Sequence, residues 1–302
     1  MNKKQPRRGP ATDNVARFTI NQDTTLLAAA AIALPDHRPT KLKSLLRHNQ
    51  LAINGVPCSQ FDHPVAAGDQ LWVNFDRSFQ VFSHPKLKLV YEDNDIIVVD
   101  KAYGLLSTAA GRPTDDTVFN IIRRYARLFS DKANVYVVHR LDRDTSGLML
   151  LTRTKHSRDI LINNWNDLVV ERKYVAVVEG EMQQQEGTVK SFLAENPDTF
   201  EMYSTTDQKL GRLAVTRYRM LQQGKRFAMV ELRIKTGRKN QLRVHMHDLG
   251  NPVSGDRKYG GHPSPINRIA LHATSITLVH PITKQTLTFN SPIPTNFTTM
   301  LK

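Results

Sequence analysis

Two short apolar runs on either side of a strongly polar loop constrain the fold of this chain more than any other feature. Residues 135–138 and 148–151 are apolar runs of the kind that forms buried strands. The loop between them contains two arginines, two aspartates, a histidine and a glycine. Loops fixed between rigid strands often carry binding or catalytic residues. The segment therefore predicts both buried strands and a candidate functional site.

Asp142 is the residue of this loop best suited to catalysis. Arg140 lies two residues before it and Arg143 directly after it. Nearby positive charges favour the ionised form of a carboxylate. Asp142 is therefore predicted to act as a nucleophile or electrostatic stabiliser rather than as a proton donor. A solvated surface loop with weak ion pairs would have the same composition, so the loop alone leaves both interpretations open.

Strands outnumber helices in the C-terminal part of the chain. Residues 228–235 alternate apolar and polar side chains cleanly, which is typical of a strand with one buried face. Many strands with few helices predict an α+β domain around an extended mixed, mostly antiparallel sheet. Further strands are predicted at about 89–99, 173–178, 187–193 and 213–221.

A helix is predicted from 238 to 250. Leu242, Met246 and Leu249 repeat at helical spacing, and Gly250 suits the C-terminal cap. Arg243 would project from this fixed element, as a bidentate partner of a catalytic carboxylate must. His245 and His247 are two residues apart and would face nearly opposite sides of the helix. Because the other histidines show no ligand spacing either, we predict no metal site.

The N-terminal part predicts a separate small α/β domain. Residues 1–16 are polar and basic, as in a flexible tail. Helices at about 26–34 and 40–48, short strands at 51–53 and 70–75, and the turn dipeptide Asn54-Gly55 predict a compact unit over residues 17–75. We expect a linker at 76–87 and the second domain at 88–302.

The charge of the chain favours an RNA partner. Lysine and arginine number 42 against 28 acidic residues, giving a net charge of +14. Such an excess suits a polyanion. No apolar run approaches the roughly 18 residues of a membrane span, and the start lacks the apolar stretch of a signal peptide, so we expect a cytoplasmic protein. The single cysteine, Cys58, excludes an internal disulfide and a cysteine-based zinc site.

Five segments in order resemble the RluA family of RNA pseudouridine synthases. The loop His139-Arg140-Leu141-Asp142 with Thr145-Ser146-Gly147 resembles the family's catalytic motif. The resemblance covers about residues 88 to 290. The other segments are 91–101 with Gly104-Leu105, 172–180, 236–245 with its continuation to Gly260, and 271–273 with His280-Pro281.

The resemblance implies the reaction and the residues that perform it. A uridine is flipped out of the RNA, and Asp142 either attacks the anomeric carbon or removes a neighbouring sugar proton. The freed uracil turns and rejoins through a ring carbon, giving pseudouridine; the product is an isomer, so no cofactor is implied. Carried over by motif position, Tyr174 either only contacts the uracil or also takes its carbon-bound proton, and Arg243 pairs with Asp142. Arg140 occupies the place of the flipped base, while Leu242 and Val244 enclose the pocket.

The small N-terminal domain resembles the S-four RNA-binding domain. Its basic helix, with Lys41, Lys43 and Arg47, would contact the RNA backbone. Two positions depart from the family pattern. Ala102 replaces a proline, which we expect to be tolerated, and Asn240 replaces a histidine, which we expect to affect local helix hydrogen bonding but not the reaction.

Two other classes of protein remain to be weighed. Asp142 and Asp144 after a strand are similar to the nucleophile loop of haloacid-dehalogenase phosphatases, but the later acidic pair that would bind magnesium is missing near Asp256. A non-catalytic RNA-binding factor could use the basic N-terminal domain equally well, although it would not need Asp142, Tyr174 and Arg243 together.

We favour ribosomal RNA over transfer RNA as the substrate by analogy, and we expect a monomer.

Overall fold

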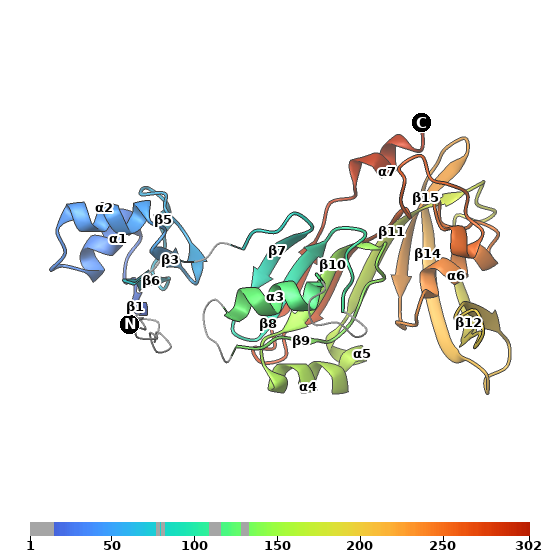
Figure 1. Ribbon diagram of the computed structural model, residues 1–302, viewed down its shortest axis with the longest axis horizontal. Coiled ribbons are helices and arrows are strands. Elements are labelled where there is room, and N and C mark those ends of the chain that lie inside the picture. Colours follow the sequence, from blue (N-terminus) through green and yellow to red (C-terminus); the bar gives the residue numbers. More distant parts are fainter. Residues whose placement is uncertain (1–14, 77–78, 80–81, 109–115, 128–132) are drawn as a thin grey trace, which may run out of the picture. The chain divides into compact units, whose positions relative to one another are not determined.

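The chain forms two compact units in the computed structural model, which describes residues 15–76, 79, 82–108, 116–127 and 133–302. The smaller unit consists mainly of residues up to Phe82 and the larger of residues from Ser83 onward (Figure 1). Most of the predicted basic tail lies outside the described residues, as do positions 77, 78, 80 and 81 of the predicted linker.

The smaller unit packs two helices against a four-stranded antiparallel sheet. Helix α2 (Pro39–Arg47) buries Leu42, Leu45 and Leu46, three leucines at helical spacing, in a core shared with α1 (Leu26–Ala33). These helices confirm the prediction from the sequence. The sheet has the order β1 (Val15–Thr19), β6 (Gln70–Asn74), β3 (Leu51–Ile53) and β4 (Val56–Pro57), and β2 (Thr24–Thr25) pairs separately with β5 (Pro64–Val65).

An eleven-stranded mixed sheet forms the larger unit. Among the described strands, β10 and β16 form the one parallel pair, and all other pairs are antiparallel. This confirms the predicted α+β fold with a mostly antiparallel sheet. The order is β13 (Met202–Thr205), β12 (Glu186–Glu195), β14 (Arg212–Gln223), β15 (Phe227–Ile234), β11 (Glu171–Glu179), β16 (Leu271–Val279), β10 (Ser146–Thr152), β8 (Ile96–Lys101) and β7 (Leu87–Glu92), with β17 (Thr286–Asn290) beside β16 and β9 (Tyr136–Val137) beside β10.

Short helices accompany this sheet, and one of them begins later than predicted. Helix α6 (Gln241–Asp248) lies against β13 and β14. Asn240, just before it, has a left-handed backbone with φ 53°, which no residue inside an α-helix can adopt, so residues 238–240 are a turn and not helix. The others are α3 (Val118–Arg127), α4 (Lys155–Asn163), α5 (Trp165–Leu168), the 3₁₀ turn η1 (Arg257–Tyr259) and α7 (Thr295–Thr299).

The parallel contact of β10 with β16 fixes the position of the polar loop. Gly147 lies opposite Ala273, and a Cβ atom on Gly147 would come within 2.2 Å of the Ala273 carbonyl oxygen. Only glycine permits so close an approach, at a φ of 108°. Ala273 in turn lies opposite Tyr174 of β11. The loop that precedes β10 is thereby held near Tyr174.

Candidate active site

A pocket of about 970 Å³ lies in the larger unit at the end of the polar loop. Small-molecule sites usually have volumes of about 300–1,000 Å³. The pocket is lined by residues of the loop, of the α5 region, of β11 and of the turn before α6. The lining includes five of the six residues predicted for this site in the larger unit: Arg140, Asp142, Tyr174, Leu242 and Arg243.

The backbone of the loop is anchored on both sides of Asp142. The Ser107 hydroxyl donates to the Leu141 carbonyl (2.6 Å) and accepts from the Leu141 amide (3.0 Å). Lys101, which is fully buried, donates its ammonium to the Arg143 carbonyl at 3.0 Å. His139 accepts from a backbone amide of β10 through Nε2, and burial lowers its pKa to about 3, so its ring is neutral. These contacts keep the loop in one conformation.

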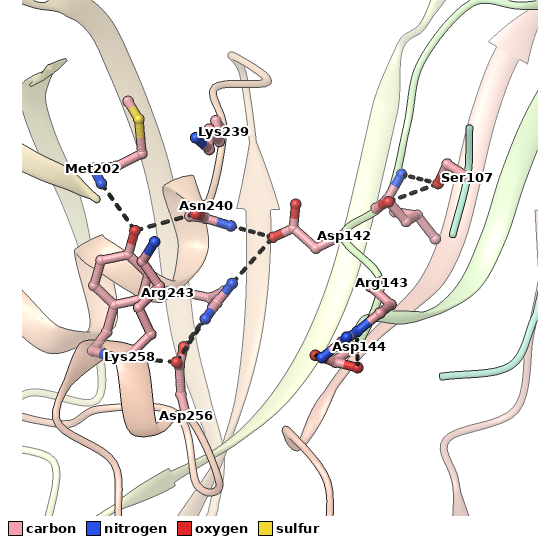
Figure 2. Close-up of polar contacts among 12 residues, drawn as sticks. Ser107, Asp142, Arg143, Asp144, Met202, Lys239, Asn240, Arg243, Asp256 and Lys258 are labelled. Atoms are coloured by element: carbon pink, nitrogen blue, oxygen red, sulfur yellow. Dashed lines mark hydrogen bonds and ion pairs between the residues drawn. The ribbon is translucent and has the colours of Figure 1, made fainter. Parts of the chain in front are cut away.

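The two carboxylate oxygens of Asp142 have different surroundings. Oδ2 accepts a hydrogen bond from Asn240 Nδ2 at 2.6 Å and lies 3.6 Å from Arg243 Nη1 (Figure 2). Oδ1 accepts no hydrogen bond from any residue that the structure describes. The side chain is 29% exposed. One oxygen is thus held by the protein and the other is available to a substrate.

Arg243 uses its planar fork on Asp256 and not on Asp142, contrary to the prediction of a bidentate pair. Its Nε and Nη2 atoms lie 2.5 and 2.7 Å from the two oxygens of Asp256, which is fully buried. Burial opposes the charge of Arg243, but the carboxylates of Asp256 and Asp142 together raise its pKa. Asp256 therefore fixes the guanidinium so that its remaining nitrogen faces Asp142.

Asn240 contacts the predicted catalytic residue directly, so its hydrogen bonding is not confined to the helix as expected. Its Oδ1 accepts from the Tyr259 hydroxyl at 3.1 Å, and that hydroxyl accepts from the Met202 amide (Figure 2). These bonds orient the amide so that its nitrogen donates to Asp142. The sequence contained one indication of this contact: Asn240 lies three residues before Arg243, at the start of the helix that carries the predicted partner of Asp142.

The neighbours of Asp142 in the sequence are not its neighbours in space. Arg143 pairs with Asp144, with two contacts of 3.1 Å, and Arg140 is exposed at the pocket. The cation beside Asp142 is Arg243, 101 residues further along the chain. The cations expected beside Asp142 from the sequence are therefore not the ones that contact it.

Tyr174 and Leu242 are buried in the pocket wall, but Val244 is not part of it. Burial raises the pKa of Tyr174, so its hydroxyl is protonated at neutral pH. Val244 packs in the core with Leu193, Met202, Ala214 and Tyr259. Successive residues of a helix point in directions about 100° apart. The prediction that Val244 encloses the pocket together with Leu242 is therefore corrected.

The predicted RNA-contacting residues of the smaller unit form an exposed basic face. Lys41, Lys43 and Arg47 are exposed on α2, while the leucines of the same helix are buried. Among the described residues, none of the three has an acidic partner within ion-pair distance. Their charges are therefore available to a ligand.

One group of side chains has the spacing of a metal site but not its chemistry. Asp93, Asp95 and His280 offer ligand atoms within 4.8 Å of one another. His280 Nδ1 accepts hydrogen bonds from the amides of residues 282 and 283, so its proton is on Nε2, which faces Asp93 at 3.1 Å. A metal would need that nitrogen without its proton.

Among the described helices, none has both the length and the apolar character of a membrane span.

Comparisons with known proteins agree with this geometry. A family model described as RNA pseudouridylate synthase matches residues 95–248. The ribosomal large subunit pseudouridine synthase D of Escherichia coli is 32% identical over 292 residues, 91% of this chain and 88% of that protein. An uncharacterized RNA pseudouridine synthase of Bacillus subtilis is 34% identical over 256 residues, 83% of this chain and 89% of that protein.

A solved structure shares the fold. The human RNA pseudouridylate synthase domain containing 4 protein superposes with a TM-score of 0.58 at 23% identity, over 70% of this chain and 90% of that one. The residues matched by the family model include the loop around Asp142, and the solved structure shows the same fold. This chain therefore belongs to the RluA family of RNA pseudouridylate synthases, isomerases that act on uridine in RNA.

Proposed function

We propose that this enzyme converts one or more uridines of large-subunit ribosomal RNA to pseudouridine, with Asp142 as the catalytic residue. The choice of RNA is supported by the name of the relative from Escherichia coli, which covers most of this chain. The observation that carries the catalytic assignment is the arrangement of Asp142, with one oxygen held by Asn240 and Arg243 and the other open to the pocket. A cytoplasmic location is part of the proposal, because ribosomal RNA is found there.

The pocket suits a flipped nucleotide. A uridine stacked in a helix cannot be detached and re-attached, so it must leave the stack. Arg140 is exposed at the pocket and can contact the RNA at the place that the uridine vacates. Leu242 and Tyr174 supply apolar and aromatic surface against which the uracil can lie.

Asp142 begins the reaction through its free oxygen by one of two routes. Attack on C1′ forms an ester and breaks the bond from C1′ to N1; removal of the C2′ proton forms a C1′–C2′ double bond and breaks the same bond. In both routes the bonding electrons leave with N1. The ring then turns and C5 bonds to C1′. In the first route the ester bond from C1′ to Asp142 breaks at this step, and in the second the proton taken by Asp142 returns to C2′. The C5 proton is then lost and N1 is protonated. Holding the ring in the pocket makes rejoining faster than escape.

Tyr174 and Arg243 support these steps in different ways. The protonated hydroxyl of Tyr174 suits contact with the ring better than removal of the C5 proton, because its raised pKa makes the phenolate scarce. Arg243 faces Asp142 with its remaining nitrogen and is itself fixed by Asp256. The exposed basic face of α2 contributes affinity for the RNA backbone, as in an S-four-like domain.

The decisive experiment compares two aspartate variants of the same loop. Asp142→Asn keeps the shape of the side chain and removes the reactive charge, so we expect pseudouridine formation to fall by at least about a thousandfold while folding and RNA binding persist. Asp144→Asn is the matched control, because Asp144 pairs with Arg143 and is absent from the pocket lining. Pseudouridine is mapped by carbodiimide-induced reverse-transcription stops in ribosomal and transfer RNA from cells without the gene, with the gene, and with each variant.

The outcomes separate the proposal from its alternative. A stop in large-subunit ribosomal RNA that returns with the intact gene and with Asp144→Asn, but not with Asp142→Asn, supports both the activity and the substrate. A stop found only in transfer RNA would show that the substrate is transfer RNA and not ribosomal RNA. Identical maps in all strains would favour a non-catalytic RNA-binding factor.

A further inference from the structure

Arg172 is one of four arginines that line the pocket, and the proposed reaction does not use it. Arg172 is only 9% exposed, yet it lines the same pocket as Asp142. Its guanidinium lies 5.3 Å from the centre of the Trp165 ring, and a Cβ atom on Gly237 would come within 3.1 Å of its Nη1 atom. The group is thus confined between an aromatic ring and a glycine backbone.

Arg172 has no carboxylate partner among the described residues, and its guanidinium lies over the Trp165 ring. Within the described part of the chain, its guanidinium makes no hydrogen bond to a side chain or a carbonyl and no ion pair. Burial lowers its pKa, as expected for a cation without a carboxylate beside it. Buried charges are normally paired because an unpaired one costs several kcal/mol. A retained, unpaired and buried guanidinium indicates a ligand that supplies the missing partner.

The charged side chains on the opposite face of β11 are paired, unlike Arg172. Side chains alternate between the two faces of a strand, so Arg172 and Tyr174 share the face toward the pocket. On the opposite face, Lys173 pairs with Glu171 at 2.9 Å. Paired charges therefore lie on one face of β11, and the unpaired cation lies beside Tyr174 on the face where the proposed reaction occurs.

The proposed reaction creates a matching anion, and the inference rests on that proposed function. By either route of Asp142, the detached uracil keeps the electrons of the broken bond. Its single negative charge is shared by N1 and the two carbonyl oxygens. A backbone phosphate is the other anion of the substrate, but it remains in water and suits the exposed Arg140. The enclosed Arg172, next to the buried Tyr174, suits the enclosed base.

We propose that Arg172 donates hydrogen bonds to a carbonyl oxygen of the target uracil and stabilises the negative charge of the ring while it is detached from the ribose. A fixed donor aimed at developing charge typically contributes about a hundredfold to a thousandfold in rate. The planar fork of an arginine suits a carbonyl oxygen and an adjacent ring atom better than the point charge of a lysine.

The test changes how well the detached uracil ring itself stabilises its negative charge. Single-turnover rates for loss of the target nucleoside are measured for Arg172→Met on RNA carrying uridine or 5-fluorouridine at the target position, by digestion to nucleosides and chromatography. Loss of the target nucleoside reports cleavage of the C1′–N1 bond on both substrates, because 5-fluorouridine has no C5 proton to lose and cannot give pseudouridine. Fluorine withdraws electrons and stabilises the ring anion, so the variant should lose less rate on 5-fluorouridine than the roughly hundredfold or more expected on uridine. RNA affinity should be nearly unchanged, and Arg172→Lys should recover part of the rate.

Stability distinguishes this role from a structural one. Methionine fills the space of the arginine stem without a buried charge, so Arg172→Met should keep or raise the melting temperature. Lys173→Met is the matched control: it removes a paired cation from the opposite face and should leave the rate unchanged.

Several results would overturn the inference. Equal losses of rate on the two substrates would do so, as would a loss confined to RNA affinity, which would indicate a phosphate contact. A lowered melting temperature that accounts for the lost rate would indicate a structural residue. Unchanged activity of Arg172→Met in an otherwise active enzyme overturns this inference alone; an unaltered protein that modifies no RNA overturns the proposed function and the inference with it.

Discussion

The amide of Asn240 separates the two oxygens of Asp142 into a held one and a free one. A carboxylate with both oxygens bonded would be inert, and one with neither bonded would rotate. The bond at 2.6 Å to Oδ2 leaves Oδ1 toward the pocket. Asparagine tolerates the left-handed backbone at this position better than most residues. The residue that replaces the family's histidine therefore performs the orienting task itself.

Removing the amide of Asn240 should slow the reaction more than it weakens the fold. Hydrogen bonds to charged groups contribute about 1.5–3 kcal/mol, so Asn240→Ala should lower the single-turnover rate by roughly tenfold to a hundredfold. Asn240→Asp should lower it further, because a second carboxylate would face Asp142. Tyr259→Phe, which frees the amide to rotate, should give a smaller loss. An unchanged rate in Asn240→Ala would show that the contact has no part in the reaction.

Strands β10 and β16 provide the element on which the site depends. They run parallel for two residue pairs, Ser146 with His272 and Gly147 with Ala273. The Ser146 hydroxyl lies 2.8 Å from His272 Nδ1, and burial lowers the pKa of that histidine to about 4, so the ring is neutral. A neutral ring can accept a hydrogen bond from the hydroxyl without adding charge beneath the catalytic loop. The contact is therefore both close and polar.

A methyl group at Gly147 should separate these strands. The added Cβ would clash with the backbone of Ala273, and alanine is strained at a φ of 108°. Strain and overpacking each cost about 1–3 kcal/mol, so Gly147→Ala should lower the free energy of unfolding by about 3 kcal/mol or more and reduce activity. Gly250→Ala is the control, with a φ of 78° and no atom within 4 Å of the added Cβ. Urea unfolding of both variants measures the difference; equal losses would assign the cost to φ alone.

Periodicity and motifs in the sequence predicted the elements, while the contacts between distant elements could not be predicted. The helices at 26–33 and 39–47 and the mostly antiparallel sheet follow from local spacing of apolar residues. The fork of Arg243 on Asp256 depends on how η1 packs against α6, which no local pattern encodes. From the sequence, Arg172 could be recognised only as part of the segment 172–180 that resembles the family. Its burial and its lack of a carboxylate partner could not be predicted, because both are properties of the folded pocket.

At the scale of the whole molecule, chemistry and proposed RNA affinity belong to different units. The pocket residues all come from the larger unit, whereas the exposed cations of α2 come from the smaller one. Contacts to phosphates displace counterions, so their contribution to affinity falls as salt concentration rises. Changes in the smaller unit should therefore alter the affinity for RNA and its dependence on salt, whereas changes in the pocket should alter the rate of the reaction.

Neutralising the basic face of α2 should weaken RNA binding without changing the chemical step. With Lys41, Lys43 and Arg47 all changed to glutamine, the slope of log affinity against log salt should fall by about 2, since each contact to single-stranded RNA contributes about 0.7. The single-turnover rate at saturating protein should be unchanged. The control changes three exposed lysines of the larger unit, Lys155, Lys209 and Lys225, to glutamine for the same loss of charge. Equal slopes in the two triple variants would argue against a specific role for α2.

The distance along the chain between Asp142 and its partners has a consequence for the protein during its own synthesis. Asp142 is oriented by residues 240 and 243, and the latter is fixed by Asp256. Translation proceeds from the N-terminus, and N-terminal domains fold first. A nascent chain therefore presents the helix that we propose to bind RNA long before its catalytic carboxylate has a partner. On this proposal, RNA binding by the growing chain precedes completion of the site, because Asp256 leaves the ribosome last of these residues.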